Sequence, residues 1–507
     1  MLNLTPLARP FFAYRAAKTA RIASPESTKQ AQMAVLRYLL SKAKRTEVGR
    51  RYRFDKIESY EQFRAAIPLS EYEAVRPMVM RMLAGEHDIL WPGICRRYAQ
   101  SSGTSGGKSK YIPITDEALS RNHYAGTVEA VAAYLNLYSE SHLFSGKSLI
   151  LGGSFANELT DIAPGMCVGD LSATLIDKIN PIVNLMRIPG KDVALMADWN
   201  RKLPAIADVA LHSNVTNISG VPSWFMTVIR TIMKKAGVDS IHDVWPNLEV
   251  FFHGGIAFGP YRDQYNAFTD SSKMRYSENY NASEGFFAIQ DTIEPGAMRL
   301  LTNIGVFYEF IDLARLDNPQ PTALPAWEVE LGRTYALVIT SCNGLWRYII
   351  GDTVKIESVE PLRISIAGRT KSFINAFGEE LMEWNTNAAL AEACRKTQAA
   401  IANYTAAPVY ADCGTKGHHQ WLIEWNVAPQ CGNEAFADIL DNELQALNSD
   451  YQAKRSGNIF LARLELTEVP AGVFDRWLAA TGKLGGQRKI PRLSNDRKVI
   501  DSILKLK

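Results

Sequence analysis

Apolar residues recur at helical spacing in the first part of the chain. Between residues 27 and 51 one helical face is apolar and basic residues fill the other, the apolar positions being Met33, Leu36, Leu39 and Leu40. Residues 59–84 repeat this spacing with an interruption near Pro68. The pattern predicts one amphipathic helix followed by two shorter ones, the last of them capped by residues 69–71.

Further along, short apolar runs alternate with helical segments. Runs bounded by turn residues predict strands at residues 111–114, 148–151, 249–252 and 334–340. A helix is predicted at 223–235 and a hairpin at 355–366. Strands that alternate with helices indicate an α/β fold with a substantial sheet.

The alternation starts again after residues 368–370. Helices are predicted at 381–399 and 433–448, and strands at 420–427 and 460–467. This second block has the usual size of a compact domain. We therefore expect two domains, residues 1–367 and residues 368–507, with a hinge near residues 370–371.

Length and charge exclude several classes of function. A chain of 507 residues is long enough for about two to four domains. Its 56 Lys and Arg against 53 Asp and Glu leave a net charge of +3, too small a surplus to favour a nucleic-acid coat or a polybasic membrane binder. No apolar run approaches the roughly 18 residues of a spanning helix, so we expect neither a nucleic-acid nor a membrane partner. The basic N-terminus lacks the compact apolar core of a secretory signal, and we interpret it as a helix docked on the main domain rather than a transit peptide.

The six cysteines stand far apart and include no CxxC pair. Disulfide frameworks and zinc sites require clustered cysteines. We therefore expect free thiols in a reducing cytoplasm, and the stretch 413–419 predicts a loop rather than a metal site. Size and composition favour a cytoplasmic globular enzyme.

Residues 101–110, with the sequence SSGTSGGKSK, are dense in glycine and hydroxyl side chains. Glycines allow backbone N–H groups to approach an anion, and hydroxyls donate to phosphate oxygens. The stretch is not a Walker A loop, because Ser102 occupies the position of the first glycine. On these residues alone, a phosphate-binding loop and a flexible surface loop are both open.

Other motifs also combine residues that could carry chemistry. Tyr280 and Glu284 have a spacing that could stack a purine and hold Mg²⁺, although a packed ring and a solvated charge are the commoner explanation. Asp352 follows a strand and Gly351, where it could accept from two ribose hydroxyls or close an ordinary turn. The basic, glycine-rich segment 482–492 could deliver a cation to a phosphate or be a solvated tail.

Taken in order, these motifs resemble the acyl-adenylate-forming superfamily, and more narrowly a bacterial-type member of the Gretchen Hagen family of acyl acid-amido synthetases. The resemblance runs from about residue 60 to residue 491. Its most specific parts are Ile67-Pro68-Leu69, Tyr72-Glu73, Arg76-Pro77, Gly85-Glu86, residues 101–107, His253-Gly254-Gly255, residues 280–285 and residues 344–348. It implies a large N-terminal α/β domain with the architecture of adenylate-forming (luciferase-like) enzymes and a small mobile C-terminal α/β domain.

The resemblance also implies roles for individual residues. The ATP phosphates would be held by Ser101, Ser102, Gly103, Thr104, Ser105, Gly106 and Gly107. The rest of the nucleotide would be bound by Gly254 and Gly255 beside adenine, Tyr280 stacked on it, and Asn281, Ala282 and Ser283. Glu284 would bind Mg²⁺, Asp352 the ribose hydroxyls, and Arg369 ribose or phosphate. Lys489 is the candidate for the catalytic lysine of the small domain, with Lys483 second.

Two positions depart from the superfamily pattern. Ile349 stands where an arginine is common, and Arg347 could substitute for it. Lys108 comes earlier than the usual loop lysine, so Lys110 could be the one that acts.

The implied reaction has two steps and needs ATP and Mg²⁺. A small carboxylic acid is adenylated with release of pyrophosphate, and the amine of an amino acid then displaces AMP. Side chains that could line an apolar acid pocket, although each is more commonly a core residue, are Val221, Trp224, Phe225, Phe258 and Tyr261. An acyl-CoA ligase that uses the same adenylation step and a catalytically silent nucleotide-binding relative are the alternatives.

Overall fold

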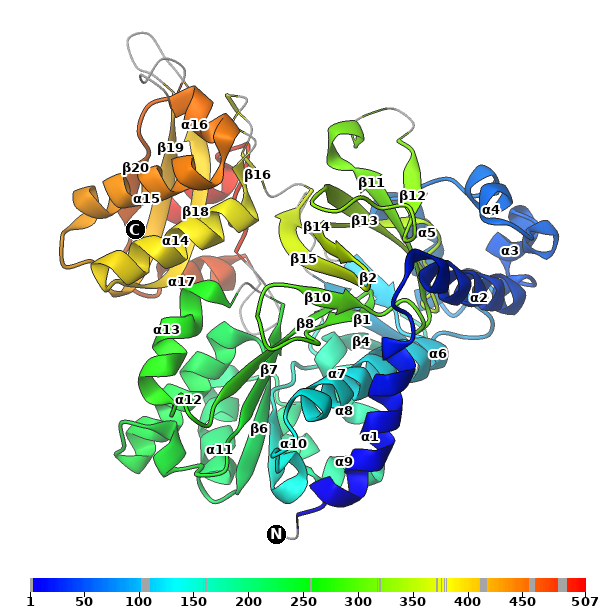
Figure 1. The fold of residues 1–507 in the computed structure, drawn as a ribbon, viewed down its shortest axis with the longest axis horizontal. Coiled ribbons are helices and arrows are strands. Elements are labelled where there is room, and N and C mark those ends of the chain that lie inside the picture. Colours follow the sequence, from blue (N-terminus) through cyan, green and yellow to red (C-terminus); the bar gives the residue numbers. More distant parts are fainter. Residues whose placement is uncertain are drawn as a thin grey trace. The chain divides into compact units, whose positions relative to one another are not determined.

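The chain folds into two compact units (Figure 1). The computed structural model describes residues 3–101, 110–157, 159, 162–255, 258–316, 318, 321–370, 373–374, 376–377, 379, 381–410, 417–455, 461–481 and 490–507. The first unit comprises the described residues up to 101, from 110 to 255 and from 268 to 366. The second comprises those from 258 to 267 and from 367 to 507.

A long mixed sheet organises the first unit. Within the described ranges it has twelve strands, in the spatial order β12 (Ala323–Pro325), β11 (Val306–Asp312), β13 (Thr334–Ser341), β14 (Tyr348–Val359), β15 (Leu362–Arg369), β10 (Met298–Leu300), β9 (Gly285–Ile289), β8 (Arg275–Ala282), β7 (Val250–Gly254), β6 (Val215–Gly220), β3 (Lys147–Ile150) and β5 (Arg187–Ile188). The neighbours β3, β6, β7 and β8 run parallel, so their carboxyl ends lie at one edge. From β8 to β9 the pairing becomes antiparallel.

A smaller sheet in the same unit carries the start of the glycine- and serine-rich stretch. In it β1 (Arg97–Ser101) pairs antiparallel with β2 (Lys110–Pro113) and parallel with β4 (Cys167–Gly169). The helices of this unit are α1 (Thr5–Ala20), α2 (Pro25–Ala43), α3 (Glu47–Arg51), α4 (Tyr60–Ala66), α5 (Tyr72–Leu83), α6 (Asp116–Ala118), α7 (Tyr124–Leu137), α8 (Leu171–Asp177), α9 (Pro181–Leu185), α10 (Lys191–Ala194), α11 (Trp199–Leu211) and α12 (Pro222–Ala236), with short 3₁₀ turns at Phe54–Lys56, Leu143–Ser145, Ile241–Asp243 and Leu313–Arg315.

The second unit has its own core. The strands β18 (Ala400–Val409) and β19 (His418–Val427) pair antiparallel, β20 (Glu465–Glu468) adds in parallel to β19, and β16 (Phe373–Ile374) pairs with β17 (Leu381–Met382). Its helices are most of α13 (Gly259–Phe268), α14 (Glu383–Thr397), α15 (Asn433–Leu447), α16 (Ser449–Arg455), α17 (Val473–Ala480) and α18 (Lys498–Leu504). Trp421, Phe436 and Leu440 lie in its fully buried core.

The predicted α/β class is confirmed, and two local predictions need correction. The helix predicted for residues 27–51 is broken into α2 and α3, because Thr46 ends one and caps the other: its hydroxyl donates to the Ala43 carbonyl at 2.7 Å and accepts from the Gly49 N–H at 3.0 Å. The cap predicted for residues 69–71 is wrong, because Glu71 precedes α5 without a side-chain cap and Ser70 pairs with Tyr348.

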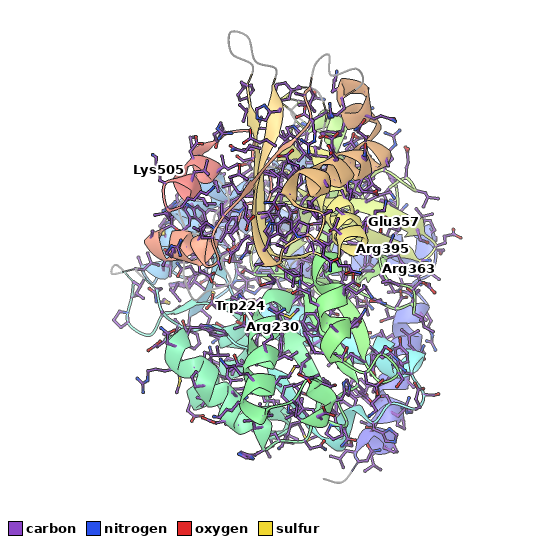
Figure 2. The ribbon with its side chains drawn as sticks, turned by 90° about the vertical axis from the view of Figure 1, so that its left-hand side faces the viewer. Trp224, Arg230, Glu357, Arg363, Arg395 and Lys505 are labelled. Carbon is purple, nitrogen blue, oxygen red and sulfur yellow. The ribbon has the colours of Figure 1, made fainter. Side chains whose placement is uncertain are left out.

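Exposure separates the two faces of α12. Trp224 is half-buried near its start and Arg230 is exposed. Both side chains are labelled in Figure 2. No helix in the described ranges is both long and apolar enough to cross a bilayer. The cysteines that the structure describes, which exclude Cys413, are all free thiols.

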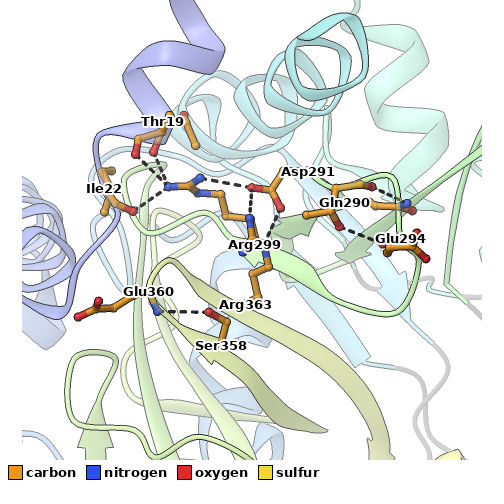
Figure 3. Close-up of polar contacts among 11 residues, drawn as sticks. Thr19, Ile22, Gln290, Asp291, Glu294, Arg299, Ser358, Glu360 and Arg363 are labelled. Carbon is orange, nitrogen blue, oxygen red and sulfur yellow. Dashed lines mark hydrogen bonds and ion pairs between the residues drawn. The ribbon is translucent and has the colours of Figure 1, made fainter. Parts of the chain in front are cut away.

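A buried arginine connects α1 to the sheet. The sequence predicted that the N-terminal helix docks on the main domain, and this contact is one part of that docking. Arg299 of β10 donates to the carbonyls of Thr19 and Ile22, each at 2.8 Å, just where α1 ends (Figure 3). Asp291 pairs with Arg299 at 3.3 Å and with Arg363 of β15 at 2.8 Å. A cation at the last carbonyls of a helix is favourable, so this cluster locks the end of α1. Burial lowers the pKa of Arg299.

We predict that Arg299→Met loosens α1 and leaves the rest of the first unit folded. The variant leaves buried helix carbonyls without their donor, a loss of about 2 kcal/mol. Hydrogen exchange should therefore speed up at the amides of α1. The control is Arg333→Met, because the Arg333 side chain is 54% exposed and solvent screens its ion pairs. Unchanged protection of α1 in Arg299→Met would contradict the assignment.

Candidate functional site

Two neighbouring strands bring the ends of the glycine- and serine-rich stretch together. Ser101 ends β1 and lies opposite Lys110, the first residue of β2, in the antiparallel register. The predicted phosphate-binding residues Ser102, Gly103, Thr104, Ser105, Gly106 and Gly107 lie outside the described residues, as does Lys108. The structure thus describes the two stems of this segment.

Lys110 is held by two tyrosines. Its ammonium lies 3.2 Å from the hydroxyl of Tyr348 and 5.8 Å from the ring centroids of both Tyr72 and Tyr348. The Tyr72 hydroxyl in turn accepts from the Tyr111 N–H at 2.6 Å. A cation above aromatic faces is stabilised by their quadrupoles. Lys110 therefore has a fixed place at the end of the segment.

The tyrosine beside Lys110 also lies near two carboxylates. Tyr348 is completely buried, and burial, then the charges of Glu284 and Asp352 with Tyr72 and Glu71, raise its pKa far above the ordinary value. Burial likewise raises the pKa of Tyr72 to about 12. Both rings therefore stay neutral, and their hydroxyls act as hydrogen-bonding groups.

Tyr280 and Asp352 come together from distant parts of the chain. The Tyr280 hydroxyl of β8 donates to the Asp352 carboxylate of β14 at 2.6 Å. The Tyr280 ring is buried and meets Phe287 edge-on, with centroids 4.9 Å apart. The two motifs that the sequence placed beside adenine and ribose are therefore in direct contact.

Glu284 lies in the tight turn between β8 and β9. Ala282 pairs with Gly285 across the hairpin, so Ser283 and Glu284 form its tip, and both are buried. Asn281 and Ala282 are the last two residues of β8. This tip is at the sheet edge where the parallel strands end.

Gly254 and Gly255, which follow His253, are glycines for two different structural reasons. Gly254 pairs with Asn279, and a Cβ at position 254 would lie 2.3 Å from the Asn279 carbonyl oxygen. Gly255 has φ +83°, a conformation that L side chains rarely adopt. The backbone after β7 therefore turns sharply at the same sheet edge.

Glu284 places a hard oxygen donor at this sheet edge, the kind of ligand that Mg²⁺ prefers. Among the described residues there is no group of three or more His, Cys, Asp or Glu side chains that could hold a metal. Mg²⁺ commonly keeps several waters and binds one or two carboxylates together with substrate phosphates. Glu284 is a carboxylate suited to that arrangement.

Comparison with known proteins identifies the family. The model of the GH3 family N-terminal domain matches residues 23–175 and 136–274, that of the central domain residues 299–369, and that of the C-terminal domain residues 385–498. The chain belongs to the GH3 family. This confirms the family that the sequence motifs resembled.

Two curated relatives of this GH3 chain match it over different lengths. The indole-3-acetic acid-amido synthetase GH3.4 of Arabidopsis thaliana is 22% identical over 93% of this chain and 90% of its own. The jasmonoyl–L-amino acid synthetase GH3.5 of Oryza sativa subsp. japonica is 24% identical over 58% of this chain and 62% of its own.

Solved structures confirm the adenylate-forming fold. The AtGH3.15 acyl acid amido synthetase in complex with 2,4-DB has a TM-score of 0.79 at 18% identity and covers 97% of this chain and 95% of its own. A 2-hydroxyisobutyryl-CoA ligase in complex with 2-HIB-AMP has a TM-score of 0.62 at 12% identity, covering 96% and 93%.

The residues predicted for the acid pocket of this GH3 chain separate into different environments. Val221 precedes α12, and the half-buried Trp224 lies 6.1 Å from Trp199 between ring centroids. Phe225 is fully buried against Phe251, so it is a core residue. Phe258 belongs to the second unit, where it is buried 5.4 Å from Tyr265; Tyr261 is buried there too.

The predicted residues of the small domain are only partly described. Arg369 ends β15 and belongs to the second unit. Lys371 at the predicted hinge and the candidate catalytic lysines Lys483 and Lys489 lie outside the described residues.

Arg347 forms an ion pair in the core of this GH3 chain. This argues against the idea that Arg347 replaces the arginine that is common at the position of Ile349. Its guanidinium pairs with Glu309 at 2.8 Å, and their side chains are only 6% and 1% exposed. It also donates to the carbonyls of Arg64 at 2.9 Å and Ile67 at 2.8 Å. Most of its donors are thus committed inside the fold.

Lys202 is a buried cation that the sequence analysis missed. Its ammonium donates to the carbonyls of Gly152, Gly153 and Met196 at 2.6, 3.2 and 3.1 Å. Burial lowers its pKa to about 8, against a smaller opposite effect of Asp170. It thereby holds the loop after β3. The sequence contains a signal for this burial, because Lys202 shares the apolar stripe of α11 with Ile206 and Ala210.

We predict that Lys202 makes stability rise with pH in alkaline solution. Its pKa is about 8 in the folded chain and about 10.5 when unfolded, so between these values the unfolded state binds more protons. Relative to Lys202→Met and Lys202→Arg, the wild-type free energy of unfolding should rise by about 2 kcal/mol from pH 7 to pH 10. Urea titrations at several pH values measure this difference. Parallel pH profiles for all three proteins would contradict the buried-cation assignment.

We predict that Arg347→Met costs stability and spares nucleotide binding. Removing Arg347 leaves the Glu309 carboxylate buried without its cation, with only the Tyr60 hydroxyl donating to it at 3.0 Å, a loss of about 3 kcal/mol. Replacing both partners, as in Glu309→Leu with Arg347→Met, should recover much of that loss. Urea unfolding measures the stability, and calorimetry measures ATP binding by the folded variants. Normal stability with weakened ATP binding would instead assign Arg347 to the nucleotide.

Proposed function

We propose that this GH3 protein is an ATP-dependent acyl acid-amido synthetase. It adenylates a small carboxylic acid and transfers the acyl group to the amine of an amino acid. The observation that carries the proposal is the 2.6 Å contact between Tyr280 and Asp352, two motif residues 72 positions apart, in a chain whose relatives are named amido synthetases over most of its length.

In this proposal each motif has one task. The phosphates are surrounded by Ser101, the segment up to Gly107 and Lys110. Adenine is surrounded by Gly254, Gly255 and Tyr280. Asn281, Ala282 and Ser283 complete the nucleotide wall, and Asp352 accepts from the ribose hydroxyls. Glu284 would hold Mg²⁺, which when bound neutralises phosphate charge.

The first step forms a bond between the acid's carboxylate oxygen and the α-phosphorus of ATP and breaks the bond to pyrophosphate. Such transfers depend on positioning and on neutralising charge, so no protein nucleophile is needed. Lys110 supplies a fixed cation at the loop. In the second step an amine attacks the acyl carbon, AMP leaves with the bonding pair, and the amine loses a proton.

The small domain supplies the remaining groups of the proposal. Residues 1–367 form the ATP- and acid-binding domain, and residues 368–507 move about a hinge near 370–371. Arg369 contacts ribose or phosphate. Lys489, or failing it Lys483, reaches the reacting carboxylate. In the first unit, Val221 and Trp224 at the start of α12 contact the acid. A two-domain hinge suits two half-reactions, because closure can complete one site and then admit the acceptor.

An acyl-CoA ligase is the second candidate, since a 2-hydroxyisobutyryl-CoA ligase shares the fold at a TM-score of 0.62. The two candidates differ only in the acceptor. Acid-dependent exchange of pyrophosphate into ATP tests the shared first step over a panel of carboxylic acids. Amino acids or coenzyme A are then added, and release of AMP is followed. Acceleration by amino acids supports the proposal, and acceleration only by coenzyme A rejects it; ATP binding without exchange identifies a silent relative.

We predict that Glu284→Gln lowers pyrophosphate exchange by about 10²–10³-fold, because it removes a charge needed to hold the metal beside the phosphates. Folding should be unaffected, since the amide keeps the shape of the side chain. The matched control is Glu294→Gln, on the exposed connection between β9 and β10, which should exchange at the wild-type rate. Near-normal exchange by Glu284→Gln removes the metal assignment.

A further inference from the structure

Two buried asparagines hold the hairpin turn that carries Glu284. Asn343 donates to the Glu284 carbonyl at 2.9 Å. Asn122 accepts from the Phe286 N–H at 2.7 Å and donates to the Phe286 carbonyl at 2.9 Å. Their residues are 1% and 3% exposed. The turn is thus bonded at Glu284 itself and two residues beyond it.

An irregular helical turn presents Asn122 to the hairpin. Residues Leu119–His123 form a π-helical turn between α6 and α7, and such turns occur frequently at functional sites. One turn later, Gly126 leaves room for the Phe286 ring, because a Cβ there would lie 2.4 Å from it. The π-helical turn therefore bonds the backbone of Phe286, and α7, which follows it directly, packs on the Phe286 side chain.

The second asparagine is tied to the start of that helical segment. Thr115 caps α6 by accepting from the Ala118 N–H at 3.0 Å, and its hydroxyl donates to the Cys342 carbonyl at 2.7 Å. Asn343 follows Cys342 directly. Asn122 is therefore part of this helical segment, and Asn343 directly follows a residue that is bonded to the start of the segment.

Close packing removes the remaining freedom of the turn. A Cβ at Gly285 would lie 2.6 Å from the Phe287 ring and 3.0 Å from the Asn122 side-chain oxygen. The backbone of a two-residue tip this crowded has little room to shift. The direction in which the Glu284 side chain leaves the turn is set by these bonds.

We propose that Asn122 and Asn343 are positioning residues that hold the Glu284 carboxylate in place for the metal of a bound magnesium nucleotide. The inference rests on the proposed function. It differs from a structural role in one measurable respect: the asparagines act on nucleotide binding through Glu284, so their effect disappears when the carboxylate is removed.

A double-mutant cycle tests this coupling. The proteins are the wild type, Asn343→Ala, Glu284→Gln and the variant with both changes. Calorimetry measures the affinity for ATP with Mg²⁺ and with EDTA, and the ratio of the two is the metal preference. We expect Asn343→Ala to lower this preference about tenfold, the effect of one misplaced charged contact, without changing metal-free affinity. In the Glu284→Gln background the same change should have no further effect.

Asn385→Ala is the matched control. Asn385 is 1% exposed, donates to the Leu447 carbonyl at 3.1 Å and accepts from the Met382 N–H at 3.0 Å. It should lose thermal stability as Asn343→Ala does and keep the wild-type metal preference. Asn343→Ser replaces Asn343→Ala if the latter does not fold.

The outcomes distinguish failure of this inference from failure of the proposed function. An unchanged metal preference in Asn343→Ala, or effects of Asn343 and Glu284 that add independently, overturns the inference while the amido synthetase proposal stands. A wild-type protein that binds ATP equally well with Mg²⁺ and with EDTA removes the metal role of Glu284 and the inference together. A wild-type protein that binds no ATP removes the proposed function.

Discussion

The parallel pairing of β3, β6, β7 and β8 is the constraint on which the whole site depends. Hydrogen-bonded register places Ile150 beside Ser219, Gly220 beside His253, and Gly254 beside Asn279, so the strands finish at one edge. In open α/β sheets ligands bind outside these carboxyl ends. A slip of one residue would turn each side chain to the opposite face, so the buried strands fix the register and with it the site.

The change of direction after β8 gives that edge its carboxylate. Because β9 returns antiparallel, the chain reverses at the end of the parallel strands, and Glu284 occupies the tip. Strand β14 brings Asp352 to the Tyr280 hydroxyl although three other strands separate β14 from β8 in the sheet. This hydrogen bond therefore joins two strands that are not neighbours in the sheet.

Burial distinguishes the charged residues that belong to the scaffold from those available for chemistry. Arg347 is surrounded by Glu309 and backbone carbonyls, and Arg299 by Asp291 and the end of α1, so both stabilise the fold. Lys202 holds a loop through carbonyls alone, which leaves its charge poorly compensated and its pKa low. Lys110 differs, because the neutral phenol of Tyr348 and the aromatic faces of Tyr72 and Tyr348 hold it.

Local patterns in the sequence were enough to predict the α/β class, the helices α4 and α5, and a family whose motifs include Tyr280, Glu284 and Asp352. Such features depend on residues a few positions apart, on spacing and on turn chemistry, and these are present in the unfolded chain. The tertiary structure alone decided that Arg347 pairs with Glu309, that Lys202 is buried, and that Asn122 bonds Phe286, which is 164 residues away in the sequence. Partners so distant meet only after sheet register and helix packing bring them together, and no local spacing encodes that meeting.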